Sequence, residues 1–400
     1  MTVVELTRSP FARLRARLRA SREAQPPMTT SAVMLASVIG ILLGGGLIMI
    51  LSSSWVSAYE NYGSSFLYFT RQVTWALIGV AAFLTMARIH YGKTRAIGYL
   101  LLAGSIVGLI AVLIPGIGVR AGGASRWLSF GIVRVQPSEF AKLGLILVGA
   151  ALLTRRGTSL RTFQDVLFPV GALAGLIGAL VMFQPDLGTT LTIGGITLTL
   201  LYLAGARMRV LGGLGIAAIG VTTMLALTEG YRRARLTVFT NPFADPLNAG
   251  YQAVQSQIAL GTGGLFGVGL GASRQKWLYV PSAHTDFIFS IIGEEMGLLG
   301  TFAVLALFAV FTWLGIRIAR HAPDAYGRIV AGTITAWIAG QAFVNIGAVT
   351  GLLPITGIPL PLVSFGGSSL VITLAALGIL MNIARHEQWP RPAGERASPA

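Results

Sequence analysis

The sequence contains no cysteine, so neither disulfide bonds nor thiolate chemistry contributes to this protein. Histidine is also scarce: the four histidines, at positions 90, 284, 321 and 386, are scattered, and we expect no metal site built from them. Charged residues make up only 11% of the 400 residues, whereas 54% are hydrophobic. That composition leaves too little polar surface to cover water-soluble domains and indicates an integral membrane protein.

Apolar runs near twenty residues, separated by short charged loops, predict an all-α polytopic membrane protein. We expect ten transmembrane helices, at residues 31–52, 67–87, 96–114, 137–154, 164–182, 187–205, 209–228, 286–319, 327–350 and 363–385. They belong to one membrane domain, residues 31–386, which contains a long connection at 229–285. A basic arm (1–30) precedes this domain and a short tail (387–400) follows it.

The basic residues predict the orientation of the chain. Every second short loop carries Arg or Lys, as at Arg88, Lys93 and Arg95. With ten spans, these loops and both termini fall on one side, which the positive-inside rule assigns to the cytoplasm, and the 229–285 connection lies outside. The net charge of +16 is concentrated at helix ends, so we expect contacts with anionic membrane lipids rather than with nucleic acid.

The most informative stretch is Pro281–Gly297, where His284, Asp286, Glu294 and Glu295 stand at the start of the eighth span. Carboxylates at membrane depth are costly, so they are candidates for a functional site. For the two glutamates, pairing with an Arg or Lys of a neighbouring helix is an equally good explanation. For Asp286, at the mouth of the helix, a functional role is favoured.

Further polar clusters fall on the same predicted outer side. Glu139 and Lys142 share a helix face, and either they form a mutual salt pair or Lys142 meets an anionic substrate group. Asp186 is expected to cap the sixth span. The prolines of 351–369 exclude a continuous helix, so this stretch should be buried in protein or line a cavity. The remaining candidates for substrate contact are Arg126, Trp127, Gln136, Arg232, Arg233, His284, Thr285, Ser364 and Ser368. A carboxylate, cations and an aromatic rim around one outer cavity fit a lipid-linked pyrophosphate.

Several motifs resemble the SEDS family of FtsW and RodA, and they occur in the same order along residues 45–385. They read GASRWLSFGIVRVQPSEFAKL, NPFADPLNAGYQAVQSQIALGTGGLFGVGLGASRQKW, PSAHTDFIFSIIGEEMG and GLLPITGIPLPLVSFGGSSL. The GASRQKW and IIGEE runs look closer to FtsW. One departure is Ser282, where many members have Glu. A catalytic carboxylate is therefore expected at Asp286 and not at position 282.

The resemblance implies an inverting peptidoglycan glycosyltransferase of the bacterial cytoplasmic membrane that polymerises lipid II outside it. The family's catalytic aspartate corresponds to Asp286, which would act as general base on the acceptor 4-hydroxyl. Cations, or a divalent ion such as Mg²⁺ or Mn²⁺, would neutralise the leaving pyrophosphate. The implied partners are a class B penicillin-binding protein and other division or elongation proteins.

Two other functions remain open from the sequence. The same cavity would serve a flippase that moves lipid II across the membrane, and the chain could instead be a non-catalytic scaffold of the division or elongation complex. The gathering of polar clusters on one side favours an enzyme, because a carrier needs access from both sides. Septal and lateral wall synthesis are not distinguished.

Overall fold

The computed structural model describes residues 28–121, 124–131, 133–155, 167–228, 238–248, 250–277, 279–280 and 283–387. In these ranges each of the ten expected spans coincides with a helix. The helices are α2 (Thr30–Tyr62), α3 (Leu67–Arg88), α4 (Thr94–Leu113), α5 (Pro137–Arg155), α7 (Ala172–Met182), α8 (Leu187–Leu203), α9 (Met208–Thr228), α12 (Ile288–Arg320), α13 (Ala325–Val349) and α14 (Gly367–Arg385). Short helical turns stand at η2 (Tyr91–Lys93) and η3 (Leu167–Gly171).

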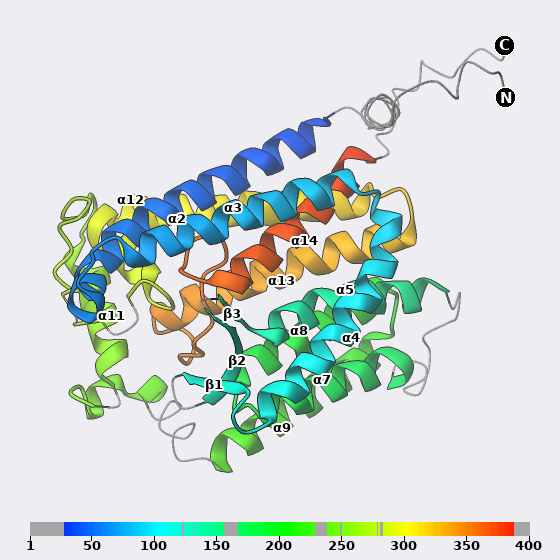
Figure 1. The fold of residues 1–400 in the computed structure, drawn as a ribbon, viewed down its shortest axis with the longest axis horizontal. Coiled ribbons are helices and arrows are strands. Elements are labelled where there is room, and N and C mark those ends of the chain that lie inside the picture. The colour runs from blue at the N-terminus through cyan, green and yellow to red at the C-terminus, as the bar shows by residue number, and fades with distance from the viewer. Residues whose placement is uncertain are drawn as a thin grey trace.

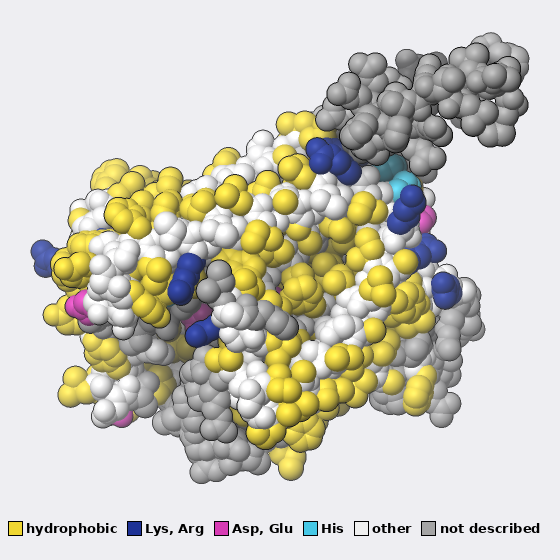
Figure 2. Space-filling view, viewed as in Figure 1, with side chains coloured by type: hydrophobic (Ala, Val, Ile, Leu, Met, Phe, Trp, Pro, Cys, Tyr) yellow, Lys and Arg dark blue, Asp and Glu magenta, His cyan; other side chains and the backbone are white. Residues whose placement is uncertain are grey.

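The structure is that of a multi-pass membrane protein. Seven of the described helices are long and apolar enough to cross a membrane: α2, α3, α4 with η2, α5, α12, α13 and α14. The apolar helices α7, α8 and α9 are shorter. The surface is accordingly hydrophobic over broad areas, and in the view of Figure 2 Lys and Arg side chains gather at its upper right end. The exact number of spans and their orientation stay predictions.

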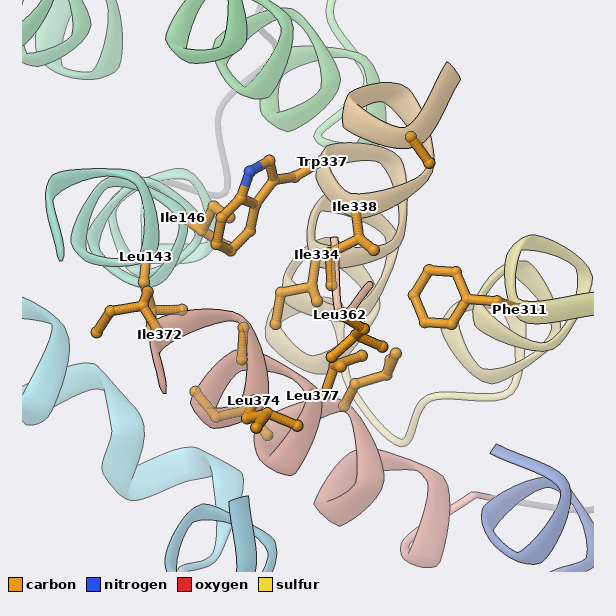
Figure 3. Packing of buried hydrophobic residues seen from close by; sticks show 14 of the residues in the cluster. Leu143, Ile146, Phe311, Ile334, Trp337, Ile338, Leu362, Ile372, Leu374 and Leu377 are labelled. Carbon is orange, nitrogen blue, oxygen red and sulfur yellow. The ribbon is translucent and has the colours of Figure 1, made fainter. Parts of the chain in front are cut away.

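Helices α5 and α14 are the most enclosed of the spans. α14 packs on α3, α5 packs on α4, and α13 packs on both α12 and α8 (Figure 1). Figure 3 shows the centre of the core, where Leu143 of α5, Ile334 of α13, Phe311 of α12 and Leu377 of α14 are all buried. Helices α5 and α14 carry apolar side chains on several of their faces, as expected for helices enclosed within a membrane bundle.

Two connections contain structure that the sequence analysis did not anticipate. Residues expected to form a loop before α5 make a small antiparallel sheet of β1 (Gly118–Ala121), β2 (Ala124–Phe130) and β3 (Val133–Val135), in the order β1-β2-β3. The fold is therefore helical with one added sheet. The long connection after α9 contains a turn, η4 (Pro242–Ala244), and the helix α11 (Tyr251–Thr262).

Two expected helix boundaries were wrong. α2 runs ten residues past the predicted end, to Tyr62, and α14 begins at Gly367 instead of 363. The latter shift follows from the proline-rich segment 351–366, which is irregular as predicted and ends only at Gly366, where the backbone is extended. Residues 1–27 of the basic arm and most of the C-terminal tail lie outside the described residues.

Candidate active site

The segment 284–286 is fixed through its backbone. Each of its three carbonyl oxygens accepts a hydrogen bond from another part of the chain: His284 O from Phe365 N (2.9 Å), Thr285 O from Ser364 Oγ (2.7 Å) and Asp286 O from Asn345 Nδ2 (2.8 Å). The side chain of Asp286 is only partly buried. The backbone is therefore held rigidly while the carboxylate stays within reach of a ligand, as a reactive group requires.

His284 packs as an aromatic side chain. Its ring lies 4.5 Å from the ring of Tyr68 and 5.6 Å from that of Phe365, measured between centroids. Burial lowers the pKa of His284 to about 4, so the imidazole is neutral at physiological pH. His284 accordingly supplies no positive charge to a substrate and serves to position the loop.

Gly357 forms the wall opposite the carboxylate of Asp286. Its φ of +75° is a left-handed conformation that favours glycine, and a Cβ at this position would lie 3.5 Å from Asp286 Oδ2. The lack of a side chain keeps the space beside the carboxylate open. Gly188 of α8 approaches the same 356–358 segment so closely that a Cβ there would lie 3.0 Å from Thr356 O.

The start of α8 connects this wall to the sheet. Asp186 caps α8, as predicted, since its carboxylate accepts hydrogen bonds from Thr189 N (3.1 Å) and Thr189 Oγ1 (2.9 Å). Arg126 of β2 lies 3.6 Å from Asp186 and donates to the carbonyl oxygens of Gln184 and Pro185. A row of contacts thus leads from Arg126 through the start of α8 to Gly357 and Asp286.

A cavity of about 530 Å³ adjoins this row. The end of α4, the start of β1, Ser125 and residues 183–185 line it, so it lies next to Arg126. Trp127 follows on β2, partly exposed, and pairs with Val119 of β1. The two residues predicted from the sequence to bind a charged, amphipathic group therefore follow Ser125, which lines the cavity, on the same strand.

Glu139 and Lys142 of α5 form the salt pair that the sequence left as one of two alternatives. Lys142 Nζ lies 2.9 Å from Glu139 Oε1 and 2.8 Å from Oε2, and it stands 5.0 Å above the ring of Trp337. The side chains are 4% and 8% exposed. This burial favours the structural alternative, because a lysine that is already paired and enclosed offers little to an incoming anion.

Three other candidates hold the backbone around the site. Besides donating to Thr285 O, Ser364 Oγ accepts from Leu360 N at 2.8 Å. Ser368 Oγ accepts from Gln136 N at 3.2 Å. The structure thus gathers His284, Thr285 and Ser364 at Asp286 and joins Gln136 to Ser368 beside them, in positioning roles. Arg232, Arg233 and Ser282 lie outside the described residues.

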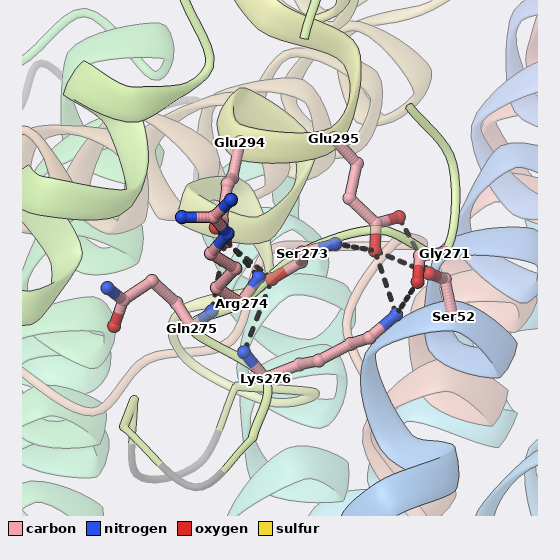
Figure 4. Close-up of polar contacts among 8 residues, drawn as sticks. All are labelled: Ser52, Gly271, Ser273, Arg274, Gln275, Lys276, Glu294 and Glu295. Atoms are coloured by element: carbon pink, nitrogen blue, oxygen red, sulfur yellow. Dashed lines mark hydrogen bonds and ion pairs between the residues drawn. The ribbon is translucent and has the colours of Figure 1, made fainter. Parts of the chain in front are cut away.

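Glu294 and Glu295 belong to a buried network at the start of α12 (Figure 4). Glu295 pairs with Lys276 at 3.3 Å and accepts from Ser52 Oγ of α2 at 2.6 and 2.7 Å. Glu294 accepts from Ser273 Oγ (2.5 Å) and from the backbone N–H groups of Arg274 (2.9 Å) and Gln275 (3.3 Å). The pairing explanation holds for Glu295, with the cation supplied by the 271–280 loop and not by a neighbouring helix.

Sequence reasoning missed the amides that hold the site together. Gln72 of α3 is fully buried, donates to Ser364 O at 3.3 Å and accepts from Gly366 N at 3.2 Å. Asn345 donates to Asp286 O. A signal existed in the sequence, because Gln and Asn inside otherwise apolar spans require internal partners.

Comparison with known proteins places this chain among related proteins of one family. A family model described as a cell cycle protein matches residues 32–389. The probable peptidoglycan glycosyltransferase FtsW of Geobacter metallireducens is 41% identical over 339 residues, 85% of this chain and 90% of that one. Its counterpart in Mycobacterium tuberculosis is 43% identical over 361 residues, 90% of this chain and 69% of the relative. Stage V sporulation protein E of Bacillus subtilis is 41% identical over 361 residues, 90% of this chain and 99% of that one.

Solved structures of related proteins have the same fold as this chain. A chain from a study of coordinated polymerization and crosslinking by a peptidoglycan synthase complex has a TM-score of 0.73 at 28% identity, covering 88% of this chain and 97% of that one. The rod shape determining protein RodA of Thermus thermophilus has a TM-score of 0.65 at 25% identity, covering 89% and 97%. The named FtsW relatives are thus more similar in sequence than this RodA structure is.

Proposed function

Since this chain belongs to the family of FtsW, RodA and SpoVE cell cycle proteins and is a peptidoglycan glycosyltransferase, we propose that it polymerises lipid II at the outer face of the bacterial cytoplasmic membrane. The observation that supports this most is the fixed backbone of 284–286, which presents one accessible carboxylate, Asp286, beside the open wall at Gly357. A single positioned carboxylate suits a glycosyl transfer that needs a base on the acceptor side.

The proposed step is an inverting displacement. Asp286 takes the proton from the 4-hydroxyl of the acceptor sugar as that oxygen attacks the anomeric carbon of the donor. The new C–O bond forms while the bond from the anomeric carbon to the phosphate oxygen breaks, and undecaprenyl pyrophosphate leaves with its electron pair. The carboxyl proton then passes to solvent. Inversion follows from attack opposite the leaving group.

The leaving pyrophosphate needs positive charge. Among the described candidates Arg126 is the better placed, because its side chain is 33% exposed and bonds the carbonyl oxygens of Gln184 and Pro185, which line the cavity, whereas Lys142 is enclosed. Arg232 and Arg233 remain candidates from the sequence. Within the described part of the chain no three His, Asp or Glu residues lie close enough to hold a metal ion. A Mg²⁺ or Mn²⁺ ion would therefore take its ligands mainly from the phosphates, with one or two carboxylates.

A partner is part of the proposal. The structural relative from the peptidoglycan synthase complex was studied for coordinated polymerization and crosslinking. We expect this chain to work with a class B penicillin-binding protein that crosslinks the strands it makes, within the division or elongation machinery.

The experiment is polymerisation of labelled lipid II by purified protein, with and without the cognate transpeptidase. Asp286→Asn should lower the rate by about 10²–10⁴-fold, the contribution of a general base, without changing thermal stability. Asp245→Asn, the same change at an exposed acid, is the matched control and should retain full activity.

Polymer made by Asp286→Asn at the parental rate would remove this residue from the chemistry. Altered sidedness of lipid II without polymer would indicate a flippase, and neither product would indicate a scaffold.

A further inference from the structure

Helix α13 buries a column of side chains with polar groups, spaced four residues apart on one face. Trp337, Gln341 and Asn345 are 3%, 6% and 2% exposed. Trp337 Nε1 donates to Gln341 Oε1 at 3.0 Å, and Gln341 Nε2 donates to Pro359 O at 3.1 Å. One turn further on, Asn345 Nδ2 donates to both Ile358 O and Asp286 O, each at 2.8 Å.

This column meets the irregular segment 351–366, in which the carbonyl oxygens of Ile358 and Pro359 accept hydrogen bonds from side chains of α13. Backbone groups inside a membrane bundle must be satisfied by protein, and the amides of α13 satisfy two successive carbonyls, those of Ile358 and Pro359. In this respect Gln341 and Asn345 have the same role, because each donates a hydrogen bond to one carbonyl of the segment.

Asn345 differs from Gln341 in one respect. Its amide nitrogen also holds the backbone of Asp286, so a single side chain joins the reactive segment to the residue after Gly357. Gly357 is the wall that faces the Asp286 carboxylate. Asn345 therefore sets the spacing between the carboxylate and the wall of the space in which the acceptor hydroxyl would lie.

We propose that Asn345 is a positioning residue for glycosyl transfer. By bonding the backbone of both Asp286 and Ile358, it fixes the distance between the Asp286 carboxylate and residues 357–358. This inference rests on the proposed role of Asp286 as base. Displacement of a catalytic group by about 1 Å can cost about 10²-fold in rate. Loss of the two Asn345 hydrogen bonds should therefore lower turnover more than substrate affinity.

The test compares two variants of the same helix in full-length purified protein. Asn345→Leu removes both donors to Asp286 O and Ile358 O, whereas Gln341→Leu removes the donor to Pro359 O and the acceptor of Trp337 Nε1 and leaves Asp286 O bonded. A third variant, Asn345→Asp, preserves the size and shape of the side chain and leaves at most one donor. Initial rates of lipid II polymerisation give kcat and KM, and melting temperatures report folding.

We expect both Asn345 variants to lower kcat roughly 10- to 100-fold while KM for lipid II stays within about twofold of the parent. Gln341→Leu should lower the melting temperature by as much as Asn345→Leu does but keep kcat within about threefold of the parent, because it leaves Asp286 held.

The inference is overturned if folded Asn345→Asp turns over at the parental rate, if Gln341→Leu loses as much kcat as Asn345→Leu, or if the Asn345 variants change KM alone. Its failure is separable from that of the proposed function. An active Asp286→Asn contradicts the base, whereas an inactive Asp286→Asn together with fully active Asn345 variants contradicts only the positioning role.

Discussion

At the scale of single residues, Lys142 and Glu139 show how burial changes the meaning of a charge. Both side chains are almost closed to solvent, and they bond each other below the ring of Trp337. Removal of one partner from such a pair leaves an uncompensated buried charge, whereas replacement of both by neutral side chains is often tolerated.

We therefore expect Lys142→Met to lose about 3–5 kcal/mol of stability and Glu139→Gln/Lys142→Met to recover most of it, as followed by thermal denaturation in detergent. Lipid II polymerisation by the double variant decides between the two roles. Activity near the parental level assigns the pair to structure. A stable double variant with strongly weakened use of lipid II assigns Lys142 to the substrate.

At the scale of secondary structure, α12 and the loop of residues 263–280 form one packed unit. The backbone of α12 breaks its helical course at Gly297, where φ is +66°, and Gly267 of the loop packs against this point. A Cβ at either glycine would overlap the backbone of the other segment. The loop backbone donates from Val268 N to Glu294 O at 2.9 Å and from Gly269 N to Glu295 O at 3.0 Å. The Lys276–Glu295 pair, together with Ser52, then fastens this unit to α2.

Lys276→Met should loosen that unit, since Glu295 loses its only cation in the network shown in Figure 4. We expect a stability loss of about 3–5 kcal/mol and faster amide hydrogen exchange over residues 263–280. Arg274→Ala is the control, because this exposed residue contributes its backbone N–H and not its side chain to Glu294. Unchanged exchange in Lys276→Met would show that the glycine packing alone holds the loop.

At the scale of the whole molecule, the contacts of the site join distant parts of the chain. Asp286 is held from α13, Ser364 bonds a segment 79 residues away, and Gln72 of α3 clamps the 364–366 turn. At the other end of the bundle, Thr29 Oγ1 donates to Ala384 O at 2.9 Å, so the start of α2 and the end of α14 lie together. This placement agrees with both termini on one side of the membrane.

The absence of cysteine allows a direct test of the predicted topology, because any introduced thiol is the only one present. In intact cells, a membrane-impermeant maleimide should label Ser64→Cys and Asp245→Cys and should not label Lys93→Cys or Arg207→Cys before lysis. All four positions are exposed. An unlabelled Asp245→Cys would mean that α7, α8 and α9 do not cross the membrane an odd number of times, and ten spans would be wrong.

Features of this protein that depend on neighbouring residues could be predicted from the sequence alone. Long apolar runs identified the helices, because burial in lipid requires a continuous apolar segment. The place of Asp186 just before the sixth span predicted its cap, and the spacing of three residues put Glu139 and Lys142 on one helix face, with their mutual pairing as one of two alternatives. The rarity of acids drew attention to Asp286. The hydrogen-bond and ion-pair partners required the folded chain: Asn345 for Asp286, 59 residues away, Lys276 for Glu295, and Phe365 and Ser364 for the carbonyls before Asp286. Hydrogen-bond partners brought together by folding share no local pattern, so they become visible only when the helices are packed.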